Sequence, residues 1–84
     1  HHFFNHQISV AALNLRKLIE GTVSSPSQRD EYIKLVHFIQ EELLKREPRL
    51  FLIKSALLSL EQSPAIKDSP AFQTFKGALP SLEA

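Results

Sequence analysis

The segment 25–60 constrains the fold most, because it carries two apolar helical patterns that are separated by Pro48. Proline donates no backbone hydrogen bond and its ring clashes with the carbonyl four residues earlier, so a helix must end or kink near Glu47. Pro48 also suits the first position of a new helix, which predicts a short turn. We therefore expect two successive helices, over residues 26–47 and 49–61.

The first of these helices has a clear start and two distinct faces. Ser25 is a suitable N-cap, Pro26 suits the first helical position, and Gln28 completes a capping box. At about 100° per residue, most of its carboxylates and lysines share one face, so we expect Glu42 to be solvated. Phe38 projects among these charges. The apolar residues share one broad face: Tyr32, Ile33, Leu35, Val36, Ile39, Leu43 and Leu44.

The second helix is apolar on most of its sides. Phe51 and Leu58 lie seven residues apart, outside its main apolar face. A helix this apolar is usually central in a bundle or lies at a subunit interface. The main apolar face consists of Leu50, Leu52, Ile53, Ala56, Leu57 and Leu60.

The remaining segments predict helices as well. Apolar residues recur at helical spacing over 8–20, and Gly21 is expected to end that helix in the left-handed conformation. Phe72 and Phe75 lie on one side of a short helix predicted over 70–76. Sustained alternation and hairpin turn pairs are missing, so no strand is expected. The sequence predicts an all-α fold, a small three-helix bundle with a short fourth C-terminal helix.

The domain organisation follows from length and composition. Eighty-four residues form one domain, which we expect over 8–77, with a tag remnant or flexible lead over 1–7 and a tail or linker over 78–84. The lack of cysteine excludes disulfides and fits a reducing compartment, so a cytoplasmic protein is expected. Since methionine is also absent, we expect a fragment of a larger protein.

Several function classes lack their usual signals. Ten basic and nine acidic residues give a net charge of +1, which does not favour nucleic acid or an anionic membrane. No apolar run approaches the roughly 18 residues of a membrane span. The histidines match no zinc spacing, so no metal, cofactor or small-molecule substrate is inferred. No catalytic constellation is visible, and we predict that the chain is not an enzyme.

The preferred function is a protein-interaction or oligomerisation module, with an adaptor or regulatory role. Its predicted partner-binding residues are Phe38, Phe51 and Leu58, because each lies off the main apolar face of its helix. The partner is a second copy, which needs no further assumption, or a different protein. Two alternatives stay open: a small nucleic-acid-associated regulator, and a helical lobe of an enzyme whose active site lies elsewhere.

Overall fold

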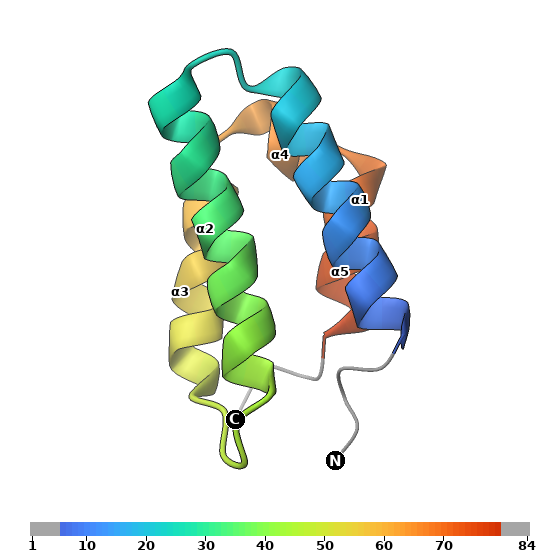
Figure 1. The fold of residues 1–84 in the computed structure, drawn as a ribbon, viewed down its shortest axis with the longest axis vertical. Coiled ribbons are helices and arrows are strands. Elements are labelled where there is room, and N and C mark those ends of the chain that lie inside the picture. Colours follow the sequence, from blue (N-terminus) through green and yellow to red (C-terminus); the bar gives the residue numbers. More distant parts are fainter. Residues whose placement is uncertain (1–5, 80–84) are drawn as a thin grey trace.

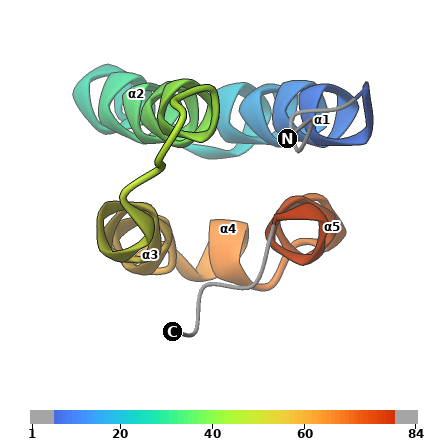
Figure 2. The ribbon, with the colours of Figure 1, turned by 90° about the horizontal axis from the view of Figure 1, so that it is seen from below.

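The computed structural model describes residues 6–79, and its regular elements there are five helices. The all-α prediction is therefore confirmed. The predicted set was three main helices and a short fourth, and the structure has one helix more. The helices are α1 (His6–Thr22), α2 (Pro26–Leu43), α3 (Leu50–Leu60), α4 (Pro64–Lys67) and α5 (Pro70–Ala78). Figure 1 shows α1 and α2 as an antiparallel pair. Seen from below, α1 and α2 form one layer, and α3, α4 and α5 form the other (Figure 2).

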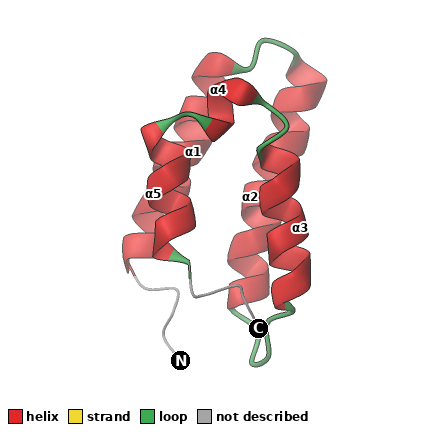
Figure 3. Cartoon of the chain, turned by 180° about the vertical axis from the view of Figure 1, so that it is seen from behind, coloured by secondary structure: helices red, strands yellow, loops and turns green. Residues whose placement is uncertain are grey.

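The helices do not have equal numbers of neighbours. Helix α1 packs against both α2 and α5, whereas α3 packs mainly against α2. The one-turn helix α4 touches α1 and α5 and lies across one end of the second layer (Figure 3). Helix α3 thus lies at one side of its layer, and one side of it faces away from the rest of the domain.

The core fills the space between the two layers and draws on all five helices. Its largest side chains are Phe72 and Phe75, both fully buried. A small chain has little apolar surface to bury, so these two rings contribute much of its stability. The other buried apolar residues are Ile8, Ala11, Ala12, Leu15, Ile19, Val23, Val36, Ile39, Leu43, Ile53, Ala56, Leu57, Leu60, Ile66 and Leu79.

Serine caps begin two of the helices, as their Ser-Pro sequences suggest. The Ser25 hydroxyl accepts a hydrogen bond from the Gln28 amide at 3.4 Å, which confirms the predicted start of α2. Ser69 is buried, and its hydroxyl accepts from the Phe72 amide and donates to the Ile66 carbonyl. Each cap satisfies an amide that the first helical turn leaves without a partner.

Helix α2 ends at Leu43, four residues before the predicted end at residue 47. Its last turn tightens, since the Leu44 and Lys45 amides donate to carbonyls only three residues earlier. Pro48 could not have continued the helical hydrogen-bond ladder. Leu44, expected on the apolar face, is consequently 63% exposed just beyond the end of the helix.

The other helix ends also differ from prediction. Helix α1 begins at His6 and continues through Thr22, so Gly21 does not end it, and neither glycine of the chain has a positive φ angle. Ala78 belongs to α5 and Leu79 is buried, although the tail was predicted to start at residue 78. The rest of that tail, from residue 80, and most of the lead over 1–7 lie outside the described residues.

Candidate functional site

The outward side of α3 is the first candidate for a functional surface. Phe51 is 68% exposed and Leu58 is 54% exposed. At about 100° per residue they project opposite the buried residues of α3, and seven residues separate them by about 10 Å along the axis. Lys54 and Ser55, both exposed, lie between them. We call Phe51, Lys54, Ser55 and Leu58 the α3 outer face.

The three predicted partner-binding residues do not form a single surface. Phe51 and Leu58 share the α3 outer face, but Phe38 of α2 is half-buried and packs against the core. The exposed Lys54, which the prediction did not include, lies between the two α3 residues. Its place in the sequence, three residues after Phe51, would have been sufficient to find it.

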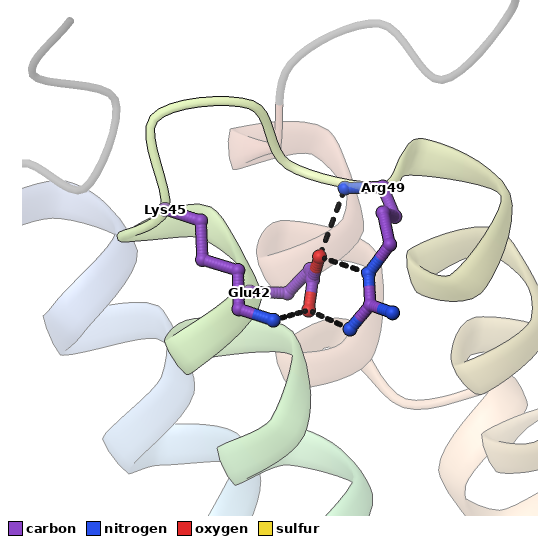
Figure 4. A network of polar contacts seen from close by, with 3 residues as sticks. All are labelled: Glu42, Lys45 and Arg49. Atoms are coloured by element: carbon purple, nitrogen blue, oxygen red, sulfur yellow. Dashed lines mark hydrogen bonds and ion pairs between the residues drawn. The ribbon is translucent and has the colours of Figure 1, made fainter.

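A buried carboxylate joins α2 to the start of α3. The side chain of Glu42 is only 1% exposed, so the expectation that it lies on a solvated face is wrong. The Arg49 amide and guanidinium Nε each donate to Glu42 Oε2 at 2.9 Å. Arg49 Nη2 donates to Glu42 Oε1 at 3.2 Å, and Lys45 Nζ lies 3.1 Å from the same oxygen (Figure 4). This carboxylate is therefore fully paired.

The contacts in this cluster determine its ionisation. Hydrogen bonds from the side chain and then the backbone of Arg49 lower the pKa of Glu42 from its ordinary 4.5 to about 2, although burial acts in the opposite direction. The hydrogen bond to Glu42 raises the pKa of Arg49. A carboxylate with these partners is a charged structural anchor, whereas a general acid or base needs a pKa near the working pH.

The sequence signal for this cluster was incomplete. Lys45 follows Glu42 by three residues, a spacing that allows an ion pair within a helix. Arg49 follows by seven residues, about 10 Å away if the helix had continued to residue 47. Because α2 ends at Leu43, the turn brings Arg49 back to Glu42.

Open depressions lie on the surface of the described residues. One of them, about 600 Å³, is open to solvent and follows α1 and α5, and His6 is among the described residues that line it. A polar depression of about 320 Å³ lies beside Ser63 and Tyr32, where the α1–α2 connection meets the start of α4. Within residues 6–79, no three histidine or carboxylate side chains are placed to hold a metal ion.

No helix in the described part of the chain is both long and apolar enough to cross a membrane. No protein-family model matches this chain, and comparisons with curated proteins and with solved structures also give no match.

Proposed function

We propose that this domain is a non-catalytic protein-interaction module that binds its partner through the α3 outer face. One observation carries the proposal: Phe51 and Leu58 are exposed together on the side of α3 that faces away from the core. Phe38, Phe72 and Phe75 are at least half-buried, so Phe51 is the exception among the described phenylalanines. Exposed aromatic anchors beside charged groups are typical of protein contact surfaces.

The size of the surface predicts a weak complex. Helix α3 has 11 residues and is about 16 Å long, so it supplies only part of the roughly 800 Å² that each partner buries in a stable complex. Burying Phe51 and Leu58 is worth about 1.5–3 kcal/mol each before the entropic cost of association. We therefore expect a dissociation constant in the micromolar range or weaker.

The nucleic-acid alternative has less support. Four basic residues surround Pro48 in the sequence, namely Lys45, Arg46, Arg49 and Lys54. Two of them, Lys45 and Arg49, share the carboxylate of Glu42, which cancels one of their two positive charges. The enzyme-lobe alternative has no particular observation in its favour.

A double substitution on the α3 outer face tests the proposed function. We expect Phe51→Ser with Leu58→Ser to leave the urea midpoint nearly unchanged, because exposed side chains contribute little to folding. The matched control is Val10→Ser with Leu13→Ser, two exposed apolar residues on α1. Sedimentation equilibrium over a wide concentration range then measures self-association of wild type and both variants.

The two outcomes of this experiment are distinct. If wild type self-associates, only the α3 variant should weaken the association. If wild type and the α3 variant are both monomers, and that variant is much less stable to urea than the α1 control, Phe51 and Leu58 belong to the fold. The proposal is wrong in that case.

A further inference from the structure

The charge on the α3 outer face has no partner within the described residues. Lys54 is exposed and makes no ion pair there, and α3 itself contains no acidic residue. Of the carboxylates that flank α3, Glu42 pairs with Arg49 and Lys45, and Glu61 lies 3.1 Å from the ammonium group of Lys76, while the exposed Glu47 makes no ion pair with Lys54. A free cation is thus left between two exposed apolar side chains.

The order of groups along α3 limits what can cover it. Lys54 lies about 4.5 Å beyond Phe51 and about 6 Å before Leu58 along the helix axis. A partner that covers both apolar side chains must therefore pass over Lys54 and remove part of its water. Desolvating an ammonium group is unfavourable unless an anionic group replaces the lost water.

Helix α3 of a second copy does not supply that anionic group. If two α3 outer faces pair about a two-fold axis, the two Lys54 side chains lie at nearly the same height in parallel and antiparallel arrangements. No residue between Leu50 and Leu60 is acidic, so neither arrangement places a carboxylate of α3 beside them. Like charges placed together disfavour an interface.

We propose that the occupant of the α3 outer face is an acidic amphipathic helix from a different protein. This inference rests on the proposed function and specifies its partner. Apolar side chains of that helix contact Phe51 and Leu58, and a carboxylate between them pairs with Lys54. Docking of an amphipathic helix through its apolar face is a common mode of peptide recognition. The chain's net charge of +1 is too small to provide this preference by itself.

Two synthetic helical peptides with the same leucine positions test the proposal. One peptide carries glutamates beside its apolar face, and the other carries lysines at the same positions. Fluorescence anisotropy of the labelled peptides measures binding to the whole chain. We expect wild type to bind the glutamate peptide about fivefold more tightly, the upper range for one exposed ion pair. Raising the salt concentration should reduce this preference.

Three variants identify the residues responsible. Lys54→Glu should reverse the preference in favour of the lysine peptide. Lys17→Glu is the matched control, because it changes the net charge equally at an exposed position on α1, in the other layer, and should keep the preference. Phe51→Ser with Leu58→Ser should abolish measurable binding of both peptides.

The outcomes separate this inference from the proposed function. If neither peptide binds, but wild type self-associates through Phe51 and Leu58, the occupant is a second copy: the inference is wrong and the proposed function stands. A preference that survives Lys54→Glu also contradicts the inference. If the chain neither self-associates nor binds either peptide, both proposals are wrong.

Discussion

Helices α3 and α5 belong to the same layer but use their phenylalanines in opposite ways. On α5, Phe72 and Phe75 are three residues apart, project toward α1 and the core, and are fully buried. On α3, Phe51 projects away from the core together with Leu58. The comparison shows that an apolar helix need not be buried on every side. The number of neighbouring helices decides how many of its sides are covered.

The two helices also begin differently. The N-terminus of α5 is capped by the residue just before it, Ser69, whose hydroxyl accepts a hydrogen bond from the Phe72 amide at 3.1 Å. Arg49, the residue just before α3, makes no side-chain cap. Its amide donates instead to Glu42 on α2. The start of α5 is therefore determined locally, whereas the start of α3 depends on contact with a second helix.

The largest expected effect on stability tests the contrast between the phenylalanines of α5 and α3. Phe72→Ala should lower the free energy of unfolding by about 3–5 kcal/mol, because it removes a fully buried ring and leaves a cavity. Phe51→Ala should change it by less than about 0.5 kcal/mol. Urea denaturation followed by circular dichroism measures both. Equal losses would mean that the α3 outer face belongs to the core.

The second effect concerns the contact between the start of α3 and Glu42 on α2. Glu42→Gln keeps the size of the side chain but removes the charge that Arg49 and Lys45 share, so it should lower the urea midpoint near neutral pH. We expect a loss between those of Phe72→Ala and Ser69→Ala. Glu41→Gln, at an exposed position one residue earlier, is the matched control and should have little effect.

The pH dependence of the same variant identifies the ionised carboxylate. Because the pKa of Glu42 is lower in the folded protein, at about 2, its contribution is complete above the ordinary value of 4.5. That contribution is lost as the pH falls from 4.5 toward 2. Wild type should therefore lose more stability over this range than Glu42→Gln. Parallel pH profiles would show that Glu42 is not the group responsible.

The smallest effect compares local caps. Ser69→Ala should cost about 2 kcal/mol, because it leaves the Phe72 amide without its partner in a buried place and removes the hydroxyl donor to the Ile66 carbonyl, which keeps only the amide of residue 69. Ser25→Ala removes a longer hydrogen bond at a more exposed position and should cost about 1 kcal/mol. Thermal unfolding compares the two. A larger loss of stability for Ser25→Ala than for Ser69→Ala would contradict the expectation that the buried cap contributes more.

The sequence by itself determined the features that depend on neighbouring residues. Ser25 and Ser69, each followed by proline, begin α2 and α5 where the pattern predicts. The all-α class follows from helical spacing throughout. The division of α3 into a main apolar face and an outer pair, Phe51 and Leu58, also follows from that spacing, and the exposures agree with it.

Only the tertiary structure decided the features that depend on distant contacts. Glu42 lies on a charged side of the sequence pattern, but the end of α2 at Leu43 lets the chain turn and bring Arg49 onto it. Phe38 lies among charges in sequence, yet the packing of the helices half-buries it. Helical periodicity gives the direction of each side chain around its own axis. Which direction meets another helix depends on turn geometry and on packing between segments far apart in the chain, and local sequence does not encode either.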